Sequence, residues 1–177
     1  MPSPPLRLSD LGRLAHIGGL LVAFEVLKRR TSLPRLLRTF ERAPHAVVTA
    51  AKVERAVWLT QGALRRCYRR DFCLPQSLVL FHLLSGWGLP VRIHFGVRKQ
   101  DGAVVGHAWL ELDGEPFCEP HDPRPFYHII HSHLSTAERY SYARRTPRLT
   151  PRGSEPTRRA ASQTLRRAEA RAAREAA

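Results

Sequence analysis

Hydrophobic residues recur at three- and four-residue steps in the first part of the chain, which is typical of helices that bury one face. The pattern predicts one helix within residues 11–27 and another within residues 47–68. Between them, Thr31 and Pro34 supply a capping hydroxyl and a first-turn proline for a short helix that Pro44 ends. The expected buried positions are Leu11, Leu14, Ala15, Leu21, Val22, Val26, Leu36, Leu37, Phe40, Val53, Val57, Leu64 and Cys67.

The pattern changes in the middle of the chain. Residues 74–85 form a short apolar run that predicts a helix, and the glycines within residues 86–88 predict its end. Over residues 91–98, apolar and polar residues then alternate strictly. This period of two predicts a strand that is buried on one face only.

Two further strands are expected to complete a sheet. The first covers residues 104–112, and the Asp-Gly pair at 113–114 is a strong hairpin signal. The second runs through Phe117 and Cys118 until Pro120 ends it. Helices first and an antiparallel sheet afterwards indicate an α+β fold.

The same patterns divide the chain into three regions. We expect an N-terminal helical region over residues 1–50, the core of the protein over residues 51–143 and a basic tail over residues 144–177. No clear helix or strand pattern follows Pro125. The tail is expected to be disordered or loosely helical. If it formed a helix, alanine and arginine would lie on all of its sides and leave no apolar stripe.

The composition shows a large net positive charge. The chain has 177 residues, 43% of them hydrophobic, which suffices for one domain with a core. Its net charge is +14, and much of the excess lies in the arginine-rich segment that begins at Arg144. A charge run of this kind is usually solvated.

The cysteines and the N-terminal sequence indicate the cellular compartment of the protein. Three cysteines with no Cys-x-x-Cys pair make a disulfide framework improbable and favour a reducing compartment. The N-terminus lacks the layout of a signal peptide. Arg13, His16 and Glu25 interrupt the apolar stretch of residues 11–27, which disfavours a membrane span. We therefore expect a cytoplasmic protein without a membrane role.

Cys73 is the first candidate for chemistry. Pro75 favours the first turn of the helix that follows, which places Cys73 at or just before the helix N-terminus. Unpaired backbone N–H groups and the positive end of the helix dipole stabilise a thiolate there. The same amides could bind an oxyanion on a substrate carbonyl. The alternative is a buried structural cysteine.

His107, on the second expected strand, is the natural partner. A neutral imidazole accepts a thiol proton near neutral pH, so Cys73 and His107 form a candidate catalytic pair. Trp109 lies two residues on, on the same strand face, where its indole could shield the imidazole from water.

A carboxylate that orients the imidazole is harder to assign. Glu119 lies beyond the hairpin, but a plain two-residue turn pairs Ala108 with Glu119 and points this carboxylate away from His107. A bulge would restore it. Asp122 is the second candidate.

Three segments together resemble a known family. CLPQSLVL (73–80), GLPVRIHFGV (88–97) and GHAWLELDG (106–114) resemble the protease domain of lasso-peptide biosynthesis B proteins, which are microcin-processing, transglutaminase-like proteins. The resemblance is closest over about residues 55–122. It implies a transglutaminase-like/papain-like cysteine protease core.

The resemblance also implies an activity and its partners. It implies a cysteine peptidase that removes the leader from a ribosomally synthesised precursor peptide, before an asparagine-synthetase-like cyclase closes a ring. A separate leader-binding protein related to the pyrroloquinoline-quinone chaperone (PqqD-like) would recruit the precursor, since no such domain is expected before the helices. No cofactor and no metal are expected.

By position, the resemblance assigns roles to three residues. Cys73 matches the nucleophile, His107 the base and Glu119 the acidic third member, where the family more usually has aspartate. Gln76 stands where arginine is common in the family.

Other functions stay open at this point. The positive charge is compatible with a scaffold that binds polyanions or peptides, although no nucleic-acid-binding motif is present. The same Cys–His pair could transfer the acyl group to an amine instead of water. A metal site is a further alternative, although the spacing of its ligands is unusual; its candidate ligands are Cys118, His121, His128, His131 and His133.

Overall fold

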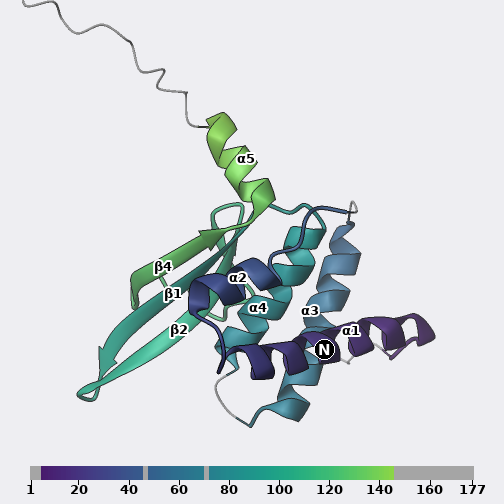
Figure 1. The fold of residues 1–177 in the computed structure, drawn as a ribbon, viewed down its shortest axis with the longest axis horizontal. Coiled ribbons are helices and arrows are strands. Elements are labelled where there is room, and N and C mark those ends of the chain that lie inside the picture. Colours follow the sequence, from purple (N-terminus) through teal and green to yellow (C-terminus); the bar gives the residue numbers. More distant parts are fainter. Residues whose placement is uncertain (1–4, 46–47, 70–71, 146–177) are drawn as a thin grey trace, which may run out of the picture. The chain divides into compact units, whose positions relative to one another are not determined.

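The helices come first in the chain and the strands follow (Figure 1). This computed structural model describes residues 5–45, 48–69 and 72–145. The described residues belong to one compact unit, Met1–Arg145. What we expected of the tail beyond residue 145 lies outside the described residues.

Four helices precede the sheet. They are α1 (Leu8–Leu27), α2 (Leu33–Phe40), α3 (Ala50–Cys67) and α4 (Cys73–Gly86). Pro34 lies in the first turn of α2, as expected. The expected cap is not formed, because the Thr31 hydroxyl donates to the carbonyl of Leu27 in α1, and α2 ends at Phe40, before Pro44. Gly88, at a φ of +72°, follows the end of α4.

The start of α1 is fixed by a buried carboxylate. Asp10 accepts a hydrogen bond of 2.8 Å from the backbone N–H of Arg7 and is bonded by the guanidinium of Arg55 in α3. The Arg55 hydrogen bonds, followed by the Arg7 amide, lower the pKa of Asp10 to about 2. This ion pair ties α1 to α3.

The buried face of α1 differs from the expected one. Ile17, Leu21 and Phe24 are buried, one or two turns apart on one stripe. Apolar residues surround this helix on most sides, so their spacing alone does not decide which stripe packs against the neighbouring helices. Of the residues expected to be buried, Leu11, Ala15, Val22, Val26 and Cys67 are exposed.

The sheet has four antiparallel strands. They are β1 (Val91–Gln100), β2 (Ala103–Leu112), β3 (Glu115–Phe117) and β4 (His128–Leu134), in the order β3-β2-β1-β4. The α+β prediction is confirmed, and so is the hairpin at Asp113 and Gly114, both of which have positive φ.

β4 and the helix α5 (Thr136–Arg145) were not identified from the sequence. β4 lies at the edge of the sheet beside β1, and Ile129 and Ile130 are exposed. An edge strand with alternating histidines and exposed isoleucines has no apolar stripe of period two, which explains why its pattern was missed.

Helix α4 lies between the sheet and the other helices (Figure 1). Its apolar side packs on the inner face of β1 and β2, where Ile93 and Leu110 are fully buried. Val79, on another side of α4, packs against Ile17 of α1 and Leu59 of α3. Because α4 is buried on both sides, its N-terminus is held firmly against β2. Among the described residues, no helix is both long enough and apolar enough to cross a membrane.

Candidate active site

Cys73 is the first residue of α4, as the proline two positions later indicated. Its side chain is half-buried, and the backbone N–H of Leu74 lies within hydrogen-bonding reach of the sulfur. Pro75 has no N–H to satisfy in this first turn. The thiol therefore lies where the helix leaves amide donors unpaired.

The uncovered edge of β2 positions this helix start. β3 pairs with β2 only as far as Leu110, so the backbone of Ala108 has no strand on its outer side. Its carbonyl accepts a hydrogen bond of 3.0 Å from the buried Ser77 hydroxyl of α4, and its amide bonds the sulfur of Cys73. The end of β3 thus leaves room for α4 to dock against the strand that carries His107.

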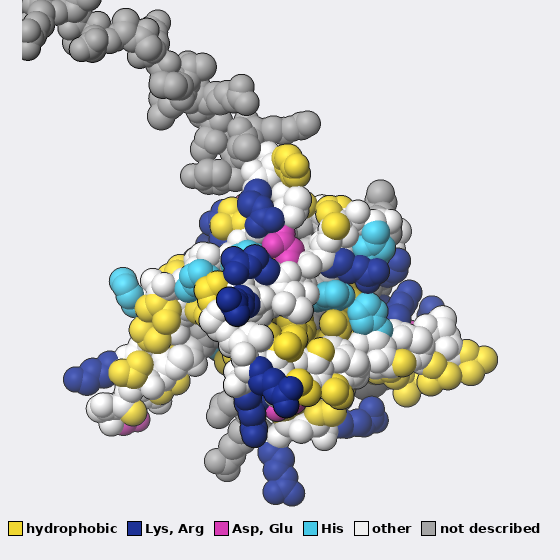
Figure 2. Space-filling view, in the orientation of Figure 1, with side chains coloured by type: hydrophobic (Ala, Val, Ile, Leu, Met, Phe, Trp, Pro, Cys, Tyr) yellow, Lys and Arg dark blue, Asp and Glu magenta, His cyan; other side chains and the backbone are white. Residues whose placement is uncertain are grey.

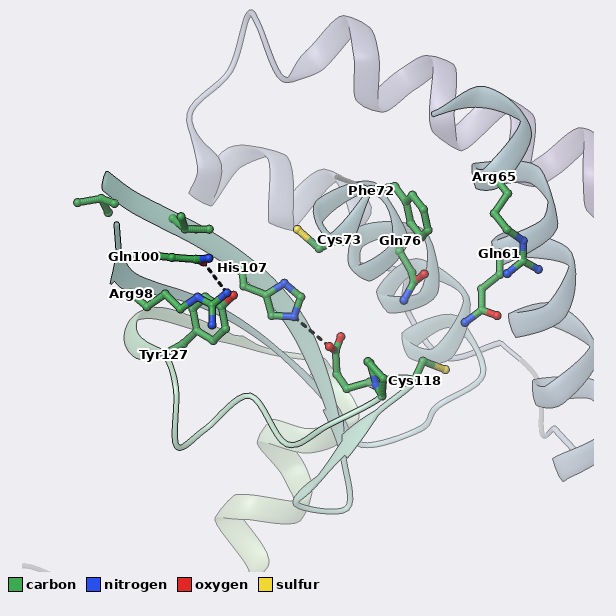
Figure 3. Close-up of a pocket in the computed structure, with 15 residues that line it drawn as sticks. Gln61, Arg65, Phe72, Cys73, Gln76, Arg98, Gln100, His107, Cys118 and Tyr127 are labelled. Carbon is green, nitrogen blue, oxygen red and sulfur yellow. Dashed lines mark hydrogen bonds and ion pairs between the residues drawn. The ribbon is translucent and has the colours of Figure 1, made fainter. Parts of the chain in front are cut away.

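His107 lies between a thiol and a carboxylate (Figure 3). Its Nε2 is 2.9 Å from Oε2 of Glu119. The side chain of Cys73 lies beside the same imidazole, and the interaction between the two raises the pKa of His107 and lowers that of Cys73. The three candidate residues are therefore brought together in the order thiol, imidazole, carboxylate.

The electrostatics favour a charged pair. Hydrogen bonds to Cys73 and then to Glu119 raise the pKa of His107 to about 9, against the opposing effect of burial. Burial alone raises the pKa of Cys73, but hydrogen bonds from His107, Ala108 and Leu74 outweigh it and lower the pKa overall. Both shifts favour a thiolate beside an imidazolium over the neutral pair.

Glu119 reaches His107 through a break in the strand. The hairpin has the expected register, Leu112 with Glu115 and Leu110 with Phe117, which would pair Glu119 with Ala108 if it continued. Instead β3 ends at Phe117, and Cys118 takes a φ of +61°. This turn, rather than a bulge, redirects the chain and aims the carboxylate at the imidazole.

Asp122, the alternative third member, is engaged elsewhere. It is exposed and accepts hydrogen bonds from the backbone and the guanidinium of Arg124, which lower its pKa. Its hydrogen bonds go to Arg124 and not to His107, so Glu119 is the carboxylate that the fold places there.

Aromatic rings enclose the imidazole. Trp109 is fully buried and stacks on His107 with ring centroids 5.9 Å apart and an interplanar angle of 16°, and Tyr127 lies 5.1 Å away. An indole face stabilises a neighbouring cation. A Cβ at Gly96 would come within 2.8 Å of both Trp109 and Tyr127, so only glycine leaves space for these rings.

A cavity of about 920 Å³ opens in front of Cys73 and His107. It was not evident from the sequence, because its walls come from α3, α4, β1, β2 and the loop after β3. Figure 3 shows Gln61 and Arg65 on one side of the pair and Arg98, Gln100 and Tyr127 on the other. The remaining lining residues are Phe72, Gln76, Val104, Val105, Gly106, Cys118, Glu119 and Pro120.

The residues of the alternative metal site do not gather. His133 contacts Glu41, and His131 lies beside Phe95. Burial, followed by the charge of Glu119, raises the pKa of Cys118 to about 11, which disfavours the thiolate that a metal would need. Within the described part of the chain, no group of three His, Cys, Asp or Glu side chains could hold a metal ion.

A helix-start cysteine packed against a strand that carries a histidine, in an α+β fold, defines a class of cysteine-nucleophile folds. A family model for the transglutaminase-like superfamily matches residues 19–132, and the chain belongs to this superfamily. The superfamily includes cysteine peptidases and acyl transferases. The comparisons with curated proteins and with solved structures each gave no match.

Proposed function

We propose that this chain is a cysteine peptidase that removes the leader from a ribosomally synthesised, lasso-type precursor peptide. The observation that carries the peptidase part is the position of Cys73 beside His107, which is hydrogen-bonded to Glu119, at the mouth of a cavity. Membership of the transglutaminase-like superfamily supports the same chemistry. The lasso-type substrate rests on the resemblance of residues 73–80, 88–97 and 106–114.

In the proposed reaction, the Cys73 thiolate attacks the scissile carbonyl carbon, and the carbonyl electron pair moves onto oxygen. Backbone amides at the start of α4 stabilise this oxyanion. The imidazolium of His107 then gives its Nδ1 proton to the departing amine, the C–N bond breaks and a thioester remains. Glu119 holds the imidazole ring through Nε2 during this proton transfer and during the later one from water.

Water completes the cycle. His107, now neutral, takes a proton from a water molecule that attacks the thioester. The C–S bond breaks, the peptide leaves with a free carboxylate and the thiolate–imidazolium pair forms again. An amine in place of water would make the product an amide, which is the acyl-transferase alternative.

The proposal includes partners and a compartment. A separate PqqD-like leader-binding protein would bring the precursor to the cavity, and an asparagine-synthetase-like cyclase would act on the released core. These proteins would act together in the cytoplasm. Selectivity for the leader would then come largely from the binding partner, so the isolated chain should be a poor general protease.

The test is cleavage of a precursor peptide from the same gene neighbourhood, in the presence of the leader-binding protein, followed by mass spectrometry. We expect one cut at the leader–core junction, with a free carboxylate, and no cut by Cys73→Ala or His107→Ala. Cys67→Ala, at an exposed cysteine outside the cavity, is the matched control and should cleave normally. Cleavage that survives Cys73→Ala would refute the peptidase, and an amide product would favour acyl transfer.

A further inference from the structure

The walls of the cavity carry more positive than negative charge. Arg65 of α3 and Arg98 of β1 line it, on opposite sides of the Cys73–His107 pair (Figure 3). Among the described residues that line it, the one carboxylate, Glu119, is already bonded to His107. A substrate that enters therefore meets two guanidinium groups that this carboxylate does not neutralise.

Arg98 stands apart from the other partly buried arginines. In the described part of the chain, these are Arg13, Arg55, Arg92 and Arg98. The first two face Asp10, and Arg92 faces Glu138 at 3.1 Å. No carboxylate among the described residues forms an ion pair with Arg98, and its Nε is buried without a hydrogen-bond partner.

Neutral groups hold this guanidinium in place. Its Nη2 donates a hydrogen bond of 2.7 Å to the side-chain oxygen of Gln100. Its Cζ lies 4.9 Å from the centroid of the Tyr127 ring, the same ring that packs against His107. Partial burial of a charge without a counter-charge costs free energy. An oriented, unneutralised guanidinium beside a reactive cysteine has the properties of a binding group for a carboxylate.

We propose that Arg98, assisted by Arg65 on the opposite wall, forms a subsite for an acidic side chain of the substrate close to the scissile bond. The favoured substrates are then peptides with Asp or Glu next to the bond that Cys73 attacks. This inference rests on the proposed function, because it concerns substrates of the same cavity.

Electrophilic peptides that alkylate Cys73 test the subsite without a known precursor. A set of short peptidyl vinyl sulfones would carry Glu, Gln or Lys at each of the two positions nearest the electrophile. The rate of alkylation of Cys73 in the full chain is measured by mass spectrometry at low salt. Exposed Cys67 reports the intrinsic reactivity of each reagent in the same sample.

We expect the Glu reagent to alkylate Cys73 about tenfold faster than the Gln reagent, the effect of one hydrogen bond to a charged group. The Lys reagent should be slowest. Arg98→Gln should remove the preference, Arg98→Lys should keep part of it, and Arg65→Gln should reduce it. Arg66→Gln removes the same charge from α3 outside the cavity and should leave the preference intact.

Two results would overturn the subsite, and they differ in what they say of the peptidase. Equal rates for Glu and Gln, or a preference that persists in Arg98→Gln, refute the subsite alone. If Cys73 reacts no faster than Cys67 with any reagent, both the subsite and the proposed cysteine chemistry fail. Unchanged reactivity of Arg98→Gln toward neutral iodoacetamide confirms that this variant keeps its fold and its Cys73–His107 pair.

Discussion

Two half-buried histidines, one beside each end of α4, have pKa values that are shifted in opposite directions. Near its N-terminus, His107 has a pKa raised to about 9. Toward its C-terminus, His82 has a pKa lowered to about 4. His82 donates from Nδ1 to the carbonyl of Phe40 at 3.0 Å, and its Nε2 lies 3.3 Å from Nε2 of His16.

The neighbours of each ring explain the difference. Burial lowers the pKa of both histidines, because it disfavours the charged ring. Around His82, the charges of His16, Arg42 and His45 lower it further. Figure 2 shows basic and histidine side chains gathered over the upper ends of α3 and α4. His107 instead interacts with Cys73 and Glu119, so these acidic partners, not the degree of burial, account for its raised pKa.

The largest expected effect comes from removing the carboxylate beside His107. Glu119→Gln should lower the pKa of His107 by more than about one unit, and each unit is a tenfold change in the protonation equilibrium. The pH range over which a Cys73 thiolate lies beside a His107 imidazolium should then narrow from its alkaline side, because Cys73 and His107 titrate as a pair. The rate of Cys73 alkylation by anionic iodoacetate, which the imidazolium attracts, reports this range when it is measured from pH 4 to pH 10.

Asp122→Asn is the matched control, since it neutralises a carboxylate in the same loop that pairs with Arg124. It should leave the pH profile of alkylation unchanged. A pH profile that shifts in Asp122→Asn and stays constant in Glu119→Gln would contradict the assignment. It would show that Asp122, and not Glu119, orients His107.

The uncertainty over Glu119 shows where prediction from sequence stopped. Cys73 and His107 stood out because their signals are local: a proline two residues after a cysteine, and a histidine on an expected strand that leads into an Asp-Gly turn. The position of Glu119 depends on one backbone angle, the positive φ of Cys118. A cysteine at this position gives no sequence signal for a positive φ. The hairpin register was correct, yet it indicated the wrong direction for the carboxylate.

The fold was predictable to a similar extent. The order of helices and strands follows from period and turn signals, so the α+β class was correct. The buried stripe of α1 and the edge strand β4 depend on which surfaces meet in three dimensions. The same holds for Arg98 and Tyr127, which lie 29 positions apart in the sequence and meet only because β4 folds back on β1.

A smaller effect is expected from disturbing the rings that enclose His107. Gly96→Ala places a methyl group 2.8 Å from Trp109 and Tyr127, so the rings must shift or the strand must move. Overpacking of this kind costs about 1–3 kcal/mol of the free energy of unfolding. Thermal unfolding should show a lower Tm, and NMR of His107 should show a lower pKa because the indole face moves away from the imidazolium.

Gly106→Ala provides the comparison on the neighbouring strand. A Cβ there would meet only the carbonyl oxygen of Gly96, at 3.9 Å, which is an ordinary contact. Its Tm should stay close to that of the wild type. Equal losses in the two variants would show that the ring packing around Gly96 is not what limits substitution.

A last expected effect lies at the other histidine and concerns stability against pH. The pKa of His82 is about 4 in the folded protein, and an ordinary histidine has a pKa of about 6.5. Between these values the unfolded chain binds a proton that folded His82 does not, so acidification from about pH 6.5 to pH 4 favours unfolding. His82→Asn keeps an N–H that can donate to Phe40 and removes the titration. The Tm of the wild type should therefore fall more steeply than that of His82→Asn over this range.

His128→Asn, at an exposed histidine of β4, controls for the loss of a histidine as such and should follow the wild-type slope. If His82→Asn also follows that slope, the cations around His82 do not suppress its protonation, and the contrast between the two ends of α4 is lost.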